Sequence, residues 1–148
     1  MDRFLDSPSF QTYAICSSVL AAKMLVSAFY TGYQRQSHQA YVNPEDARVF
    51  GKAKVRAQAE EAPEVAHALR IQRNDLENIP AFFAIGLIYV LAGASVTGAL
   101  WYFWVFTLAR VAHTFAYANH LQPWRAIFYA TGVLCMLGMI TQIFIAVL

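Results

Sequence analysis

The residues best suited to bind a charged molecule fall into two groups, and each group has the spacing of one helical face. One group lies inside an apolar run and consists of Arg110, His113, Thr114 and Tyr117. The other opens an apolar run and consists of Arg70, Arg73, Asn74 and Glu77. In both groups the members are offset by 0, 3, 4 and 7 residues, so their side chains project from the same side of a helix. Guanidinium groups gathered in this way are suited to holding carboxylates or phosphates.

The elements that carry these groups are expected to be membrane helices. The chain has 148 residues, of which 58% are hydrophobic and 14% are charged, whereas a soluble domain is about one quarter charged. A helix of about 20 residues, rising about 1.5 Å per residue, crosses a hydrocarbon core of about 30 Å. We therefore predict a single all-α membrane domain over residues 1–148, a bundle of four transmembrane helices. Its spans are expected at about 12–33, 63–92, 99–119 and 125–147.

Several protein classes are disfavoured by the same composition. The net charge of +2 is too small to indicate nucleic-acid binding. Cys16 and Cys135 lack partners at metal-ligand spacing, so we expect both to be small buried hydrophobic residues and expect no metal site. Residues 1–10 have neither the basic start nor the cleavage site of a secretory signal, which predicts that the first apolar segment is retained.

A long polar connection separates the first two expected spans. Its basic residues are Arg35, Arg48, Lys52, Lys54 and Arg56. Within it, Asn43 followed by Pro44 and two acids predicts a helix start with asparagine as the N-cap. Pro63 is suited to begin the next helix and Gly93 to end it.

Two charged residues lie inside expected spans, where a charge is costly. Lys23 is near the middle of the first span, and we expect it to pair with a carbonyl or an acid. Arg110 is well inside the third span with His113 and Tyr117 on the same face, which favours a place in a site or in the helix interior.

The distribution of basic residues predicts the orientation of the chain. Four spans place both termini on one side of the membrane, and most Lys and Arg flank the other side, which the positive-inside rule makes cytoplasmic. Arg35, residues 70–77, residues 110–117 and the pair Arg125 and Tyr129 then approach the same leaflet. Arginines gathered in a partly dehydrated site repel one another unless anions compensate. A polyanionic ligand is the simplest partner.

Each of these residues also has a structural interpretation. Arginines near helix ends commonly extend to lipid phosphate. Tyr117 and Tyr129 suit the membrane interface, His113 suits a hydrogen-bonded interior position, and Asp75 suits pairing with a neighbouring arginine.

Three motifs connect the chain to a known family. They are Asn43-Pro44-Glu45-Asp46 in the first connection, residues 73–78 (RNDLEN) and residues 109–117 (ARVAHTFAY). Together with the four expected spans, they resemble the MAPEG family, the membrane-associated proteins of eicosanoid and glutathione metabolism. The chain is most similar to the branch that contains microsomal glutathione transferases and prostaglandin E synthases. This resemblance implies a homotrimer of four-helix subunits, with glutathione held in polar clefts between subunits that open toward the cytoplasm.

The resemblance also implies a set of glutathione contacts. They fall on Arg35, Arg70, Arg73, Asn74, Glu77, His113, Tyr117, Arg125 and Tyr129, with Arg110 and Thr114 lining the same cleft. In the family, the arginine that matches Arg125 looks like the cation that favours the glutathione thiolate. Asp46 matches an aspartate to which the synthase chemistry is assigned. Glutathione offers two carboxylates to arginines and one ammonium to Glu77.

The implied activity is transfer of glutathione to a lipophilic electrophile that arrives from the bilayer, with glutathione peroxidase activity toward lipid hydroperoxides. Ala126 stands where the synthases have a serine, which favours transfer. Arg73, residues 110–113 and Tyr129 look more like the synthases, so endoperoxide isomerisation is the alternative. A non-catalytic lipid scaffold is a third hypothesis, against which the many arginines argue. The implied location is the endoplasmic reticulum membrane in a eukaryote or the inner membrane in a bacterium.

Overall fold

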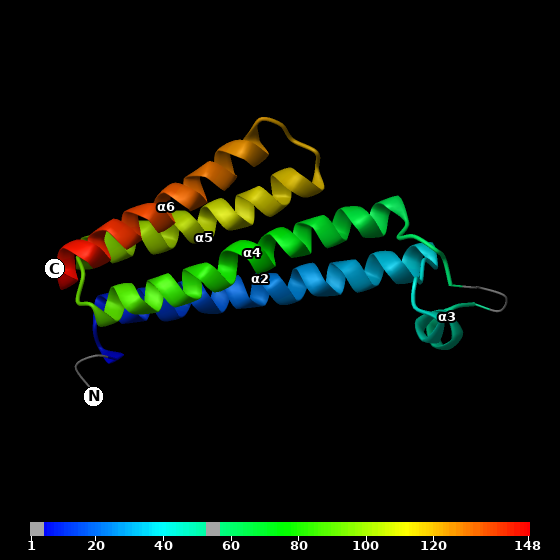
Figure 1. Ribbon diagram of the computed structural model, residues 1–148, viewed down its shortest axis with the longest axis horizontal. Coiled ribbons are helices and arrows are strands. Elements are labelled where there is room, and N and C mark those ends of the chain that lie inside the picture. The colour runs from blue at the N-terminus through cyan, green and yellow to red at the C-terminus, as the bar shows by residue number, and fades with distance from the viewer. Residues whose placement is uncertain (1–4, 53–56) are drawn as a thin grey trace.

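The computed structural model describes residues 5–52 and 57–148, and all regular structure within these ranges is helical (Figure 1). The helices are α2 (Pro8–His38), α3 (Pro44–Phe50), α4 (Pro63–Leu91), α5 (Val96–Ala118) and α6 (Trp124–Val147). The all-α prediction is confirmed for these ranges. Lys54 and Arg56 of the basic connection, and residues 1–4 of the amino end, lie outside them.

The long helices pack in two pairs. In Figure 1, α2 and α4 lie side by side, and α5 and α6 form a second pair against them. Both chain ends lie at the same end of the molecule as the turn between α4 and α5, whereas α3 lies at the opposite end. The polar connection between α2 and α4 and the turn between α5 and α6 therefore lie away from the termini.

The first long helix extends beyond the apolar run at both ends. It begins at Pro8 because the Ser7 hydroxyl caps it, accepting a hydrogen bond from the Phe10 amide at 3.2 Å, and proline is suited to the first helical position. It continues to His38 and stops where Gln39 adopts a left-handed conformation, with φ of 50°. Hydropathy does not locate these ends, since helical hydrogen bonding continues through polar residues outside an apolar core.

The proline signals located two further helix starts. Pro44 and Pro63 occupy the first turns of α3 and α4, as predicted. Asn43 has the extended backbone of an N-cap, but its side chain makes no capping bond and instead donates to Asp46 Oδ2 at 3.1 Å. Asn43 is therefore the N-cap residue, as predicted, although its side chain bonds to Asp46 and not to the helix backbone.

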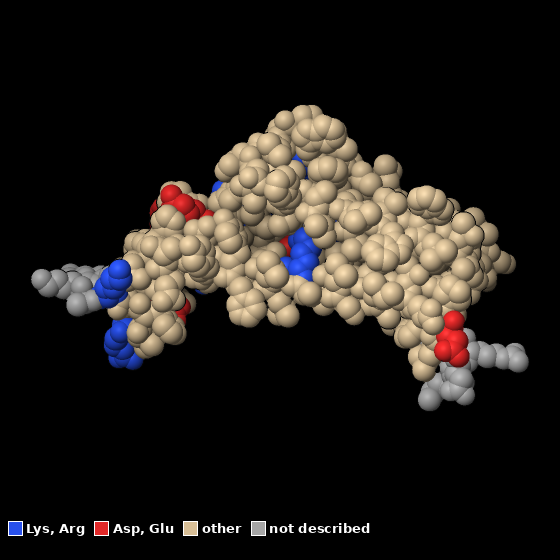
Figure 2. Space-filling view, turned by 180° about the vertical axis from the view of Figure 1, so that it is seen from behind, with Lys and Arg blue, Asp and Glu red and all other residues tan. Residues whose placement is uncertain are grey.

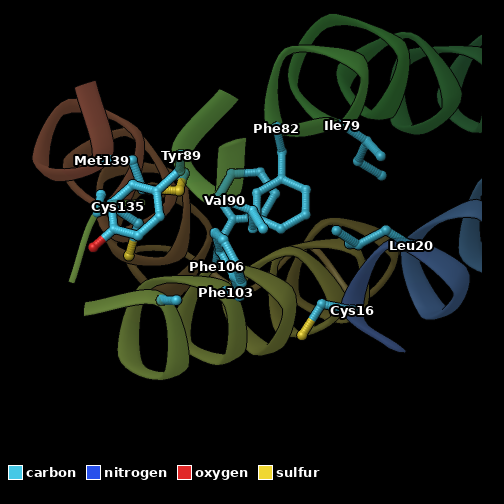
Figure 3. Close-up of a cluster of buried hydrophobic side chains, with 12 residues drawn as sticks. Cys16, Leu20, Ile79, Phe82, Tyr89, Val90, Phe103, Phe106, Cys135 and Met139 are labelled. Atoms are coloured by element: carbon cyan, nitrogen blue, oxygen red, sulfur yellow. The ribbon is translucent and has the colours of Figure 1, made fainter. Parts of the chain in front are cut away.

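Aromatic rings fill the space between the two helix pairs (Figure 3). Phe82 of α4 stacks on Phe106 of α5, with centroids 4.5 Å apart and planes 7° from parallel, and meets Phe103 edge to face at 5.6 Å. Aromatic pairs of this kind contribute about 0.5–1.5 kcal/mol beyond the area they bury. Cys16 and Cys135 are free and buried in this cluster, which confirms the predicted burial of both.

The outer surface of the helices is strongly apolar. Large exposed side chains include Leu25, Phe29, Trp101, Phe115, Leu134 and Ile145. Figure 2 shows one face almost free of charge, with acidic and basic atoms near its two ends and a small charged spot midway. A water-soluble chain rarely exposes apolar surface this extensively.

Two helices, Pro8–His38 and Trp124–Val147, are long and apolar enough to cross a membrane. Charges along the first half of α4 lower its mean hydropathy, and α5 carries Arg110 and His113 inside its run.

Candidate functional site

Arg110 is the centre of a polar cluster between α4, α5 and α6. Its side chain is fully buried, and its Nη2 donates to Asn74 Oδ1. Its Nε and Nη1 are also buried and have no hydrogen-bond partner within the described residues. Gly132 of α6 admits the aliphatic part of this side chain, since a Cβ there would lie 3.5 Å from Arg110 Cδ. A buried guanidinium with two unpaired nitrogens is costly, and these nitrogens are suited to donating hydrogen bonds to an anion or a carbonyl oxygen.

A second buried charge cluster lies directly beside it. Lys23 Nζ and Asp75 Oδ1 are 2.5 Å apart, and the Ser27 hydroxyl donates to Asp75 Oδ2 at 2.6 Å. The expectation that Lys23 pairs with an acid is confirmed. Asp75 pairs across the helix interface with α2 and not with a neighbouring arginine, because its position points inward while the arginines of α4 point outward. Asn74 and Asp75 thus tie α4 to α5 and to α2 through consecutive residues.

Arg125 rests on the face of an aromatic ring. Its guanidinium carbon lies 4.6 Å from the centroid of the Tyr117 ring, a cation–π contact. Gln122, with its amide oxygen turned toward the guanidinium, accepts from Arg125 Nε at 3.1 Å and from Nη2 at 2.7 Å. At the start of α6, the Arg125 guanidinium therefore lies between the Tyr117 ring and the Gln122 amide.

His113 links this cation to the Arg110 region. Its ring centroid lies 5.8 Å from that of Tyr117 and 6.3 Å from that of Tyr129, and its side chain is buried. Arg110 interacts electrostatically with His113 and Tyr129, so five predicted site residues lie near one another, together with the Asn74 amide of α4: Arg110, His113, Tyr117, Arg125 and Tyr129.

The rest of the α4 group faces outward. Arg73 Nε and Glu77 Oε1 pair at 3.1 Å with side chains 82% and 57% exposed, and Arg70 is exposed as well. Successive helix residues are rotated by about 100°, so a stripe with offsets 0, 3, 4 and 7 covers a broad arc. Asn74 occupies the edge of that arc nearest the buried face, and it alone of the four contacts Arg110 among the described hydrogen bonds.

No contact described in the structure joins Thr114 to the Arg110 cluster. It lines a groove of about 390 Å³ between α2 and α5 that Lys23 and Phe115 also border. Its hydroxyl is buried and has no hydrogen-bond partner among the described residues.

Arg35 and Asp46 belong to a different cavity. Both line a space of about 640 Å³ between the last turns of α2 and the short helix α3. Arg35 Nη2 also pairs with Glu61 Oε1 at 2.8 Å. None of the Arg110 cluster lines this cavity, so a single chain does not bring all the predicted site residues together.

Three residues near the cluster were not predicted from the sequence. They are His67, His120 and Gln122. His67 precedes Arg70 by three residues, so extending the helical stripe by one turn would have included it. The contacts of His120 and Gln122 depend on the path of the turn between α5 and α6, which no periodic pattern specifies.

Comparisons with known proteins identify the family of the chain. The MAPEG family model matches residues 13–145. Human prostaglandin E synthase is 36% identical over 140 residues, which cover 94% of this chain and 90% of that protein. Rat microsomal glutathione S-transferase 1 is 35% identical over 136 residues, 89% of this chain and 86% of its own length. The human form of that transferase is 33% identical over 134 residues, 89% of this chain and 86% of its own length. The chain is an all-helical membrane protein, and it belongs to the MAPEG family.

Proposed function

We propose that the chain is a membrane-bound glutathione transferase that activates glutathione as the thiolate and transfers it to lipophilic electrophiles. The observation that carries this proposal is the Arg125 guanidinium held over the Tyr117 ring at 4.6 Å. A cation held in place at the end of an apolar helix bundle is suited to stabilise a thiolate. The similarity to microsomal glutathione S-transferase 1 supports the same substrate.

The charges of glutathione fit the remaining residues. Its two carboxylates suit Arg73 and the unpaired nitrogens of Arg110, and its ammonium suits Glu77. In the proposed reaction the thiol releases its proton to water, and Arg125 stabilises the resulting thiolate. The sulfur then attacks an electrophilic carbon, the new carbon–sulfur bond forms, and the leaving group departs with its electron pair.

We also propose that the site is completed by a second subunit in a homotrimer. Arg35 and Asp46 line a cavity that none of the Arg110 cluster borders within one chain, which supports a site shared between subunits. A cleft between subunits would unite Arg35 of one copy with Arg125 of the next.

The proposed membrane arrangement has α2, α4, α5 and α6 as four spans, with α3 outside. The basic residues of the connection between α2 and α4, and Arg125 after the last turn, then lie on the cytoplasmic side. The site would open toward the cytoplasm at the endoplasmic reticulum membrane of a eukaryote or at the inner membrane of a bacterium. Lipid-borne electrophiles would approach from the apolar surface.

Conjugation of glutathione to a chlorodinitrobenzene by the purified protein tests the transferase. We expect one thiol consumed for each product formed, and reduction of a lipid hydroperoxide with two glutathiones consumed. A folded protein that consumes no thiol above the uncatalysed rate would refute the proposal.

Glutathione-dependent endoperoxide isomerisation is the second candidate. Asp46, in the cavity with Arg35, and the 36% identity to human prostaglandin E synthase favour it. An isomerase regenerates glutathione, so product without net loss of thiol would identify this activity. A lipid scaffold remains the third candidate, and it predicts no glutathione binding at millimolar concentration in isothermal titration.

A further inference from the structure

His67 lies in the second turn of α4, and its ring contacts residues from two other parts of the chain. Its centroid is 5.4 Å from that of Tyr117 on α5 and 4.6 Å from that of His120 in the turn before α6. Arg70 Nη2 approaches His67 Nδ1 at 3.5 Å. The imidazole is therefore held from two sides while it packs against the tyrosine.

Tyr117 is the ring on which Arg125 rests. Apart from His67, the ring described in contact with Tyr117 is that of His113, one turn earlier on the same helix. Because His113 moves together with α5, it cannot fix the tyrosine relative to α4. Among the described ring contacts of Tyr117, His67 is the one that comes from α4.

A cavity beside His67 gives the Tyr117 ring room to move if its contact with the imidazole is lost. A polar cavity of about 420 Å³ is bordered by His67, Arg70 and His120, together with residues of α2. Removing the imidazole would enlarge this cavity next to Tyr117 and leave the tyrosine ring free to turn toward it. A cation–π contact holds only while the ring stays beneath the cation, and small displacements of a reacting group cost rate.

We infer that His67 is a positioning residue that fixes the Tyr117 ring and, through it, the Arg125 guanidinium beside the glutathione sulfur. The chain of contacts runs from His120 through His67 and Tyr117 to Arg125, and each step is a ring–ring or cation–ring contact. The inference rests on the proposed function, because it assigns His67 a part in activating the same thiol.

The test compares His67→Ala and His67→Phe with wild type, each purified as the full chain in detergent. His38→Ala is the matched control, since His38 is an exposed histidine at the end of α2. Two quantities are measured: the ultraviolet absorbance of the bound glutathione thiolate as a function of pH, and kcat and KM for glutathione with a chlorodinitrobenzene. A merely structural histidine would not change the thiolate signal of the folded protein.

We expect His67→Ala to lower kcat and the thiolate fraction at neutral pH by about tenfold, with KM for glutathione changed less than about twofold. His67→Phe restores a ring against Tyr117, so it should recover kcat to within about threefold of wild type. His38→Ala should match wild type.

The inference is overturned if His67→Ala matches His38→Ala, or if His67→Phe is as impaired as His67→Ala. If the alanine variant does not fold, His67→Leu takes its place, because leucine fills similar volume without a ring; equal activity of His67→Leu and His67→Phe then overturns the inference. A wild-type protein with no thiolate signal and no conjugation removes the proposed function itself, whereas a normal wild type with unaffected His67 variants removes only the role of His67.

Discussion

The Arg125 guanidinium carbon lies 4.6 Å above the centroid of the Tyr117 ring, which joins the base of α6 to the last turns of α5. The contact fixes a cation that would otherwise extend toward lipid phosphate or water. Fixed in this way, the charge can act on a thiol without first being reoriented.

Arg125→Ala should lower kcat much more than it raises KM for glutathione. The guanidinium is assigned to the thiolate and not to the peptide carboxylates, so its loss should reduce kcat by about 10–100-fold while KM changes by less than about threefold. Steady-state kinetics with varied glutathione measures both. Arg48→Ala, an exposed arginine of α3, is the control, and a rise in KM with unchanged kcat would reverse the assignment.

Arg73→Ala should show the opposite pattern. Arg73 is 82% exposed and pairs with Glu77, and an exposed ion pair of this kind contributes only about 0–1 kcal/mol to stability. We therefore expect an unchanged melting temperature, with KM for glutathione raised about tenfold and kcat nearly unchanged. If KM stays at the wild-type value, Arg73 does not bind a glutathione carboxylate.

Asp75→Asn should destabilise the fold. Lys23, with 10% of its side chain exposed, would lose its anionic partner between α2 and α4, and breaking a buried pair costs about 3–5 kcal/mol. Thermal unfolding in detergent measures the loss against Glu45→Gln, a change at an exposed acid of α3. The double variant Lys23→Met with Asp75→Leu should recover much of the stability. Equal melting of Asp75→Asn and Glu45→Gln would contradict a structural role for the pair.

Asp46→Asn should distinguish the two candidate activities. Asp46 lines the cavity with Arg35, whereas the cation assigned to the thiolate is Arg125 over Tyr117, and the proposed conjugation assigns no step to Asp46. We expect conjugation within about twofold of wild type and any endoperoxide isomerisation reduced by more than about tenfold. Product analysis with both substrates measures the two rates, and equal effects on both would remove the distinction.

The sequence predicted the helices better than it predicted the faces they present. Pro44 and Pro63 located helix starts because proline constrains the backbone locally, and Lys23 required a partner because a charge inside an apolar helix is costly. The sequence did not predict how the α4 group Arg70, Arg73, Asn74 and Glu77 is oriented. Offsets of 0, 3, 4 and 7 place these residues on one face of a helix but do not say which edge of that face is buried. Asn74 and Asp75 lie at or beyond that edge, and they make the contacts to α5 and α2.

The His67 and Gln122 contacts were not predictable for a different reason. His67 reaches Tyr117 across 50 residues of chain, and Gln122 reaches Arg125 through the conformation of a turn. Contacts of this kind depend on how α4, α5 and α6 pack against one another. A single sequence contains periodicity and local turn signals, but it does not specify the relative rotation of packed helices.

The central claim is that Arg125 favours the thiolate of bound glutathione. The most direct measurement is a pH titration of the thiolate absorbance when glutathione is added to the wild-type protein and to Arg125→Ala. We predict that wild type lowers the pKa of the bound thiol by about two, which corresponds to about 2.7 kcal/mol, and that Arg125→Ala returns it toward the value of free glutathione. The same thiol pKa in both proteins, with glutathione bound to each, would contradict the account.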